Sequence, residues 1–232
     1  RTARGAHAAG VCERLVDISA VSSLSGLRTL VIDDCNELVD LGPLRTATAL
    51  EELVIRKGCS GLQLSSLAAL TSLRVLEVDE QRGAIDLSGL SQHDRLEHLA
   101  LRGCGRGLVL PPLSGLVRLS RLVLERSSLP DLSPLAGLPA LESLTLYRLT
   151  GGSEPLDLAP LGTVTTLVHL KASGNERIQG LGPLASLASL ESLDLSRCQS
   201  VTDITPIAGL GALRSLDLCS CSLAELPALH GL

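Results

Sequence analysis

The feature that most constrains this chain is a repeat of about 23 residues. The pattern L-x-x-L-x-L recurs nine times, with Ile, Val or Ala replacing the last leucine in some units. The first leucines of the units are Leu27, Leu50, Leu73, Leu96, Leu119, Leu141, Leu167, Leu190 and Leu213, at spacings of 23, 23, 23, 23, 22, 26, 23 and 23 residues. Such a period predicts a solenoid, because each unit can bury its leucines only against its neighbours.

The frame also extends backwards to Arg4 and places Cys12, Leu15 and Ile18 at repeat positions. We therefore expect a degenerate repeat over residues 1–26 and nine further repeats over 27–232, the last one truncated, in a single solenoid domain. The last leucines of the sequence need a covering layer. For this reason we expect further repeats or domains of the same chain beyond both ends.

The residue pattern of each unit predicts a short strand followed by a short helical segment. Alternation at Leu193, Asp194 and Leu195 indicates a strand whose leucines point inward. Several units continue with Ser, Thr or Gly before proline, as at Ser133-Pro134 and Thr205-Pro206. Such pairs are typical of the first turn of an α- or 3₁₀-helix, with the first residue as cap.

This pattern resembles the leucine-rich repeat family over nearly the whole chain. The resemblance implies an α/β leucine-rich repeat solenoid, with a parallel sheet on the concave side and short helical or 3₁₀ turns on the convex side. Two subtypes are mixed. "LSRCQSVTDI" at 195–204 is similar to the cysteine-containing repeats of F-box adaptor proteins, and "DLSPLAGL" at 131–138 is similar to internalin repeats.

Composition argues against two classes of partner. The chain has a net charge of −5 and a single aromatic residue, Tyr147, so it lacks the basic surface and the stacking residues that nucleic-acid binding uses. It also lacks an apolar run of the length that membrane insertion needs. We expect no nucleic acid, membrane insertion or cofactor among its ligands.

Most cysteines fall in one structural row. Cys12, Cys35, Cys104, Cys198 and Cys221 share the ninth repeat position, which Asn175 occupies in another unit. The family resemblance implies that this side chain turns inward and hydrogen-bonds the turn. We interpret the row as structural and predict no metal site, and the odd cysteine count favours an intracellular, reducing compartment. Because the sequence does not begin with Met, an extracellular surface location stays as the alternative.

Outward-facing charges alternate in the N-terminal half. The second positions are Arg28, Glu51, Arg74, Glu97, Ser120 and Glu142, and the seventh positions are Asp33, Arg56, Asp79, Arg102 and Glu125, followed by Tyr147. Neighbouring strands lie about 4.8 Å apart, so opposite charges in a row attract. We expect these charges to neutralise one another up to Tyr147.

The candidate binding site lies where that alternation stops. The repeat that contains Tyr147 is three residues longer than most, and its extra residues lie in "RLTGGSEP" at 148–155, which we expect to overhang the sheet edge. Tyrosine and arginine are enriched in interface hot spots. The predicted partner-binding residues are Tyr147, Arg148, Arg126, Arg121, His169, Lys171 and His98. The alternative is that Tyr147 only fills space under its own loop.

His169 also has Ser143, Ser192 and Asp194 as predicted neighbours, but an open sheet offers no oxyanion hole or water-excluded cleft for catalysis. The family resemblance implies a non-catalytic scaffold that binds a protein partner on the concave face. Two alternatives stay open: the substrate-receptor arm of a ubiquitin ligase, suggested by the cysteine-type repeats, and a surface adhesin or antigen, suggested by the internalin-like turns.

Overall fold

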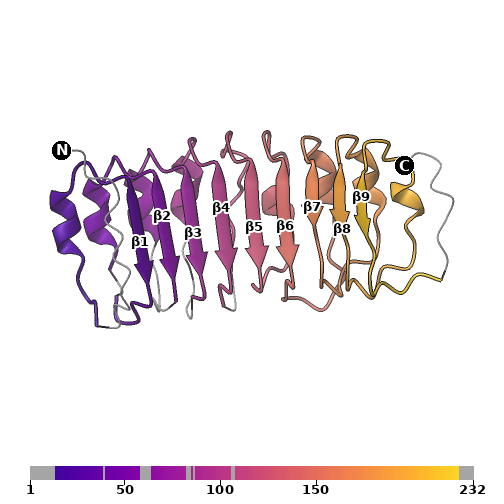
Figure 1. The fold of residues 1–232 in the computed structure, drawn as a ribbon, viewed down its shortest axis with the longest axis horizontal. Coiled ribbons are helices and arrows are strands. Elements are labelled where there is room, and N and C mark those ends of the chain that lie inside the picture. The colour runs from indigo at the N-terminus through magenta and orange to yellow at the C-terminus, as the bar shows by residue number, and fades with distance from the viewer. Residues whose placement is uncertain are drawn as a thin grey trace.

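The computed structural model describes residues 14–38, 40–57, 64–81, 85, 87–105 and 108–224. Its nine strands form one parallel sheet in chain order (Figure 1). The strands are β1 (Thr29–Asp33), β2 (Glu52–Arg56), β3 (Val75–Asp79), β4 (His98–Arg102), β5 (Arg121–Glu125), β6 (Ser143–Tyr147), β7 (His169–Lys171), β8 (Ser192–Asp194) and β9 (Ser215–Asp217).

The register of the sheet is the repeat itself. Leu30 pairs with Leu53 and Leu53 with Leu76, so residues one repeat apart lie side by side. The longer unit keeps this register, because Leu144 pairs with Leu170 across its insertion. The sequence prediction of a leucine-rich-repeat solenoid with a parallel sheet is confirmed.

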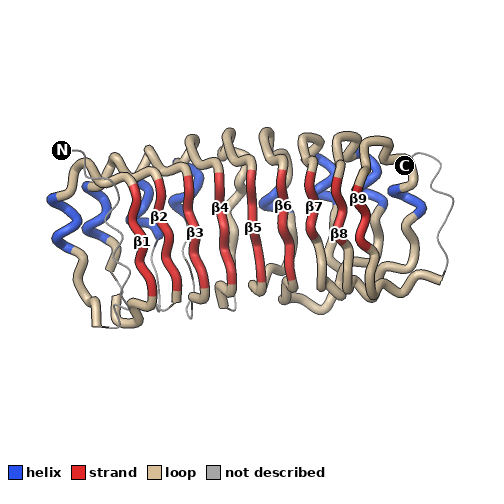
Figure 2. Tube along the Cα trace, in the orientation of Figure 1, coloured by secondary structure: helices blue, strands red, loops and turns tan. Residues whose placement is uncertain are grey.

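The helical segments are all 3₁₀ in the described part of the chain, and they lie on one side of the sheet (Figure 2). They are η1 (Ser19–Ser23), η2 (Gly42–Thr46), η3 (Leu64–Ala69), η4 (Ser88–Gln92), η5 (Ser133–Leu135), η6 (Ala159–Thr163), η7 (Gly182–Ser186) and η8 (Thr205–Ile207). A segment of three to six residues is too short for a stable α-helix, and 3₁₀ geometry is common in such connectors.

The caps of these turns differ from the expectation. The Ser, Thr or Gly before proline is the first residue of the turn and does not cap it. The N-cap residues are Leu132 and Ile204, and the preceding aspartate bonds the turn: an Asp131 carboxylate oxygen accepts the Ser133 N–H at 2.8 Å, and Asp203 accepts that of Thr205 at 2.8 Å. Hydrogen bonds from the Ser133 hydroxyl and backbone lower the pKa of Asp131. The carboxylate reaches one of the N–H groups that a helix start leaves unpaired.

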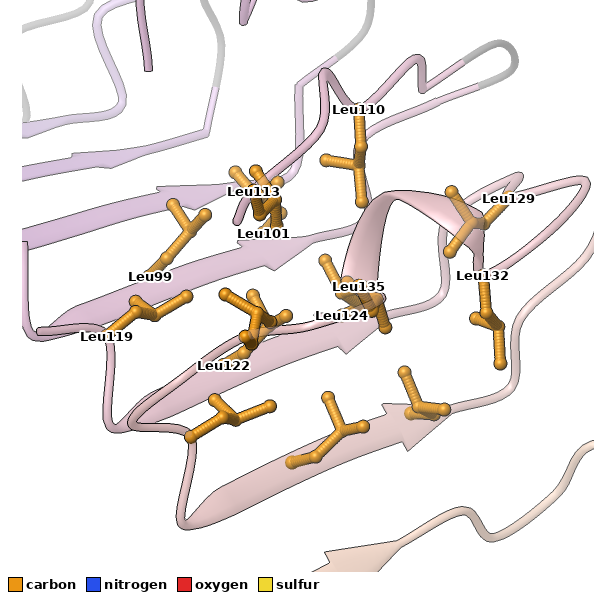
Figure 3. Packing of buried hydrophobic residues seen from close by; sticks show 14 of the residues in the cluster. Leu99, Leu101, Leu110, Leu113, Leu119, Leu122, Leu124, Leu129, Leu132 and Leu135 are labelled. Atoms are coloured by element: carbon orange, nitrogen blue, oxygen red, sulfur yellow. The ribbon is translucent and has the colours of Figure 1, made fainter. Parts of the chain in front are cut away.

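Leucine fills the core between the sheet and the turns. The fourth and sixth residues of each repeat point inward from the strands, and leucines of the descending segments meet them, as Figure 3 shows for Leu99, Leu122, Leu124, Leu132 and Leu135. These five side chains are fully buried. Because one residue type recurs at each layer, the core has the same cross-section from repeat to repeat, which is why it needs no aromatic side chains.

The strands shorten after Tyr147. Strands β1–β6 have five residues each, whereas β7–β9 have three. In β8 and β9 the fifth repeat position is aspartate. Asp194 accepts the Ser196 N–H at 2.9 Å and Asp217 accepts the Cys219 N–H at 2.9 Å. These local bonds hold the two carboxylates on their own turns, while backbone bonds such as that from the Arg197 N–H to the Cys219 carbonyl continue beyond β8.

Candidate interaction site on the concave face

The concave face is here the side of the sheet turned away from the 3₁₀ turns. Its N-terminal half carries several of the expected ion pairs. Arg28 pairs with Glu51, Arg74 with Glu97 at 2.9 Å, and Arg102 with Glu125 at 3.8 Å. Exposed pairs of this kind contribute about 0–1 kcal/mol each. They neutralise charge more than they stabilise the fold.

The alternation is incomplete at β1–β3. Arg56 lies between Asp33 and Asp79 in the register, but it forms no ion pair with a described residue. One buried carboxylate oxygen of each aspartate has no hydrogen-bond partner in the structure. The expectation that the whole seventh row pairs is therefore wrong at this step, since the Arg56 side chain is exposed instead of lying along the row.

Glu77, at the fifth position of its repeat, was not predicted as a charged contact. Its carboxylate lies 3.7 Å from Nε2 of His98 and 3.4 Å from Nη1 of Arg102. Burial lowers the pKa of His98, while Glu77 acts in the opposite direction. His98 is thus engaged with Glu77 within the N-terminal half, and the structure does not bring it to Tyr147.

Tyr147 ends β6 and carries two cations on its ring. The guanidinium carbon of Arg148 lies 5.5 Å from the ring centroid and Nζ of Lys171 lies 5.6 Å from it. Neither cation forms an ion pair with a described residue. Gly174 makes room for this packing, because a Cβ there would lie 2.9 Å from Cγ of Arg148 and 3.5 Å from the Tyr147 ring. Two cations without an ion-pair partner therefore lie within cation–π distance of the Tyr147 ring.

The other predicted site residues lie outside this cluster. Arg121 and His169 are exposed on β5 and β7, one on each side of Ser143 of β6. The Arg126 side chain extends toward the N-terminal repeats, where its Nη2 lies 4.0 Å from the Glu80 carboxylate. The structure therefore brings Arg148 and Lys171 to Tyr147, whereas Arg121 and His169 lie beside Ser143, at the other end of β6.

The neighbours of His169 do not form a catalytic group. Ser143 and Ser192 flank it in the register, as the sequence predicts. Asp194, however, accepts hydrogen bonds from the backbone and hydroxyl of Ser196, at 2.9 and 2.6 Å. That carboxylate holds a turn, so it does not orient the imidazole as a catalytic aspartate would.

The insertion at 148–155 is tied to neighbouring turns by Arg177, which sequence reasoning missed. Its guanidinium donates to the carbonyls of Gly151, of Glu154 at 2.7 Å and of Pro130 at 3.2 Å. Thr150 also forms a parallel bridge with Ser128. The segment packs against the descending turns, which corrects the expected overhang. The inserted carbonyls need donors, and a long arginine supplies several at once.

The ninth-position row hydrogen-bonds the turns as expected. The Cys198 thiol donates to the Ala172 carbonyl at 3.1 Å, and Asn175 donates to the carbonyls of Leu146 and Ala172, both at 2.8 Å. Burial raises the pKa of the Cys104 thiol to about 12 and that of Cys198 to about 11. Cys35 and Cys221 make the same kind of bond, whereas Cys12 and Cys59 lie outside the described residues. None of the five described cysteines forms a disulfide.

Sequence reasoning also missed the eighth repeat position, whose backbone is left-handed in every repeat from β1 to β9. Seven of these residues are not glycine, at φ values between 47° and 62°: Asp34, Lys57, Glu80, Arg126, Arg148, Arg197 and Ser220. Non-glycine residues pay about 1–2 kcal/mol for this conformation. This left-handed conformation turns the chain away from the strand. It also fixes the backbone positions from which the Arg126 and Arg148 side chains extend.

Two further properties concern the described part of the chain only. No group of three or more His, Cys, Asp or Glu side chains is placed there to hold a metal ion. None of its helical elements has the length and apolar character that crossing a membrane requires.

Comparison with known proteins gives matches to repeat proteins. The model of "Leucine Rich repeats (2 copies)" matches residues 165–209. A search of curated protein sequences found no match. Among solved structures, internalin InlF from Listeria monocytogenes is 24% identical over 88% of this chain, with a TM-score of 0.66. The TLR13–ssRNA13 complex gives 26% over 90% and 0.73, and internalin C2 from L. monocytogenes gives 26% over 85% and 0.51.

This chain spans 64% of the InlF chain, 31% of the TLR13 chain and 83% of the internalin C2 chain. The repeat register, the 3₁₀ turns, the ninth-position bonds and these matches agree. The chain has the leucine-rich-repeat fold, and its residues 165–209 match the leucine-rich-repeat model.

Proposed function

We propose that this chain is a non-catalytic scaffold that binds a protein partner on its concave face, at a site centred on Tyr147. Leucine-rich-repeat folds generally mediate protein–protein interaction. The observation that carries the location is the Tyr147 ring with Arg148 and Lys171 beside it, at 5.5 and 5.6 Å. A half-buried tyrosine next to arginine is the composition typical of interface hot spots.

Charge supports the same location. The chain has a net charge of −5, but Arg148 and Lys171 form no ion pair with described residues. A partner with an acidic rim around an apolar patch would complement this surface. Rim charges of this kind set the association rate more than the affinity.

We also assign the chain to a reducing, intracellular compartment in this proposal. The described thiols, such as those of Cys104 and Cys198, donate hydrogen bonds to backbone carbonyls. A reducing compartment would keep them in that state.

The test compares three baits in parallel affinity purifications with mass spectrometry: the unmodified chain, Tyr147→Ala and Arg56→Ala. Arg56 is an exposed matched control, because it also stands at the seventh position. Proteins retained by Arg56→Ala and lost by Tyr147→Ala are candidate partners. With one in hand, calorimetry should show that Tyr147→Ala weakens binding by about 2 kcal/mol, roughly 30-fold.

Tyr147→Phe separates the ring from the hydroxyl and should retain most of the affinity if the cation-bearing ring is the contact. Unfolding midpoints of all variants are compared first, so that a loss of binding is not a loss of fold. A partner whose binding is abolished by Arg56→Ala and unaffected by Tyr147→Ala would place the site on the N-terminal half and refute the proposal.

A further inference from the structure

A second surface feature lies at the edge where strands β2–β5 begin, the upper edge in Figure 1. A hollow of about 480 Å³ opens there. It is lined by Glu51, Ser72, Arg74, Arg95, Glu97 and Arg118. These residues come directly before or after the first leucine of four consecutive repeats. Tyr147 lies at the opposite edge, as the last residue of β6, so the hollow is separate from the proposed binding site.

Both acidic residues of the hollow already have partners. The Glu97 carboxylate accepts two hydrogen bonds from Arg74, from Nε at 3.0 Å and Nη2 at 2.9 Å. This bidentate contact lowers the pKa of Glu97 and raises that of Arg74. Glu51 pairs with Arg28. Each carboxylate thus contacts one arginine directly, and the charge of Arg118 further lowers the pKa of Glu97 without an ion pair.

Two positive charges are left over. Arg95 and Arg118 are exposed and form no ion pair with any described residue. They precede the first leucines of adjacent repeats, so their backbones are about one strand spacing, 4.8 Å, apart. Side chains this close and lining one hollow can contact a single bound group. Asp94 precedes Arg95 but does not line the hollow.

We propose that this hollow binds a phosphate group carried on a segment of a protein partner. A phosphorylated side chain has a charge of about −1.5 to −2 at neutral pH and so matches two arginines, whereas one carboxylate matches one. The planar guanidinium group binds phosphate oxygens through paired N–H donors. The Arg74–Glu97 pair lines the same hollow, so its two charges already compensate each other.

A nucleic acid fits the hollow less well. Its phosphates would continue past Arg95 and Arg118 and meet the carboxylates of Glu51 and Glu97 on the same surface. Base stacking needs aromatic side chains, and the sole aromatic residue of the chain lies at the other edge of the sheet. The local arrangement favours one phosphate on a neutral segment over a polyanion.

The test uses the whole chain and four probes: a short peptide with one central phosphoserine, its unphosphorylated form, inorganic phosphate and a single-stranded RNA oligonucleotide. Nε–Hε resonances of arginine are followed by NMR and assigned by their loss in Arg95→Ala and Arg118→Ala. The phosphopeptide should shift both resonances. The double variant should bind it at least about tenfold more weakly.

Arg214→Ala is the matched control. Arg214 is also exposed near the start of a strand, with Nε 3.9 Å from Glu191, but it does not line the hollow. Its replacement should leave phosphopeptide binding unchanged. All three substitutions remove exposed side chains, and equal unfolding midpoints show that the fold is intact.

Four results would overturn the proposal. They are equal binding of the phosphorylated and unphosphorylated peptides, undiminished binding by the double variant, inorganic phosphate binding as tightly as the phosphopeptide, and RNA binding more tightly through the same arginines. The third would mean that the site takes a free anion, and the fourth that it takes a nucleic acid. None of them bears on Tyr147, so the two proposals fail separately.

Discussion

Replacing Asn175 by alanine should weaken the solenoid at the junction between the repeats of β6 and β7. Asn175 is 2% exposed. Its amide donates to the carbonyls of Leu146 and Ala172 at 2.8 Å, and its side-chain oxygen accepts the Leu149 N–H at 2.8 Å. Leu149 occupies the ninth position of its own repeat and has no polar side chain there. The asparagine of the next repeat therefore supplies bonds for both turns.

The expected cost follows from these three contacts. A net hydrogen bond contributes about 1 kcal/mol, and a buried group left without a partner costs about 1–3 kcal/mol. The Leu149 N–H donates to no other acceptor among the described residues, and Leu149 is 7% exposed. We expect Asn175→Ala to lower the free energy of unfolding by about 3–5 kcal/mol. Asn175→Asp should cost as much, because a carboxylate would face two carbonyl oxygens.

Tyr147 provides the assay, since it is the only aromatic residue and lies two positions from Leu149. Urea unfolding followed by its emission reports this junction, and circular dichroism reports the whole array. Repeat arrays can unfold in parts, so the emission midpoint should move more than the dichroism midpoint. Gln199→Ala, at an exposed position, is the control. A loss below about 1 kcal/mol for Asn175→Ala would refute the reasoning.

Three further predictions concern single residues. Burial raises the pKa of the Cys104 thiol to about 12, so Cys104 should react slowly with a thiol reagent in the native state, and exposed Cys219 should react faster. Mass spectrometry of the labelled peptides measures both rates. Rapid native labelling of Cys104 would contradict its structural role. Arg177→Ala should speed hydrogen exchange at 151–154 with little change in global unfolding, because it removes the donors of that segment; unchanged exchange would show that the Thr150 bridge suffices. The pKa of Asp131 in the folded protein lies below its unfolded value of 3.8. The Asp131 carboxylate therefore stabilises the fold above pH 3.8, and this contribution is lost as the pH falls through the folded pKa. Asp131→Asn should flatten the acid limb of the stability curve, measured by thermal unfolding from about pH 5 to 2.

The fold was predictable because the repeat period is also the register of the sheet. Once Leu30 and Leu53 are equivalent in sequence, they can be paired in space, and the strand positions follow. The choice between α- and 3₁₀-turns was not fixed by the pattern, since segments this short satisfy both. The Asp-x-x-Pro spacing at Asp131 and Asp203 was a usable signal for the bonds that start these turns, but it was assigned to the wrong residue.

The site was only partly predictable. The predicted order of the strands correctly placed Lys171 beside Tyr147, because their repeats are adjacent in the sheet. This order gave no indication of Arg177, whose guanidinium reaches carbonyls 23 to 47 positions away through loop geometry. Glu77 was missed because the fifth position was considered only at Lys171 and Asp194, near Tyr147, and not in the N-terminal repeats. His93 similarly replaces the leucine of other repeats and is buried between the carbonyls of Leu67 and Gly89.

Most ion pairs of the described residues precede Tyr147, although Arg214 pairs with Glu191 after it, and the strand aspartates after Tyr147 make different bonds. In β1–β5, carboxylates such as Glu97 and Glu125 pair with arginines across the strands. In β8 and β9, Asp194 and Asp217 bond their own turns. Carboxylates held by backbone N–H groups are poorly placed to neutralise Lys171 on the neighbouring strand. The cations at Tyr147 therefore stay unpaired although Asp194 lies opposite Lys171 in the register, because the Asp194 carboxylate bonds the backbone and hydroxyl of Ser196 instead.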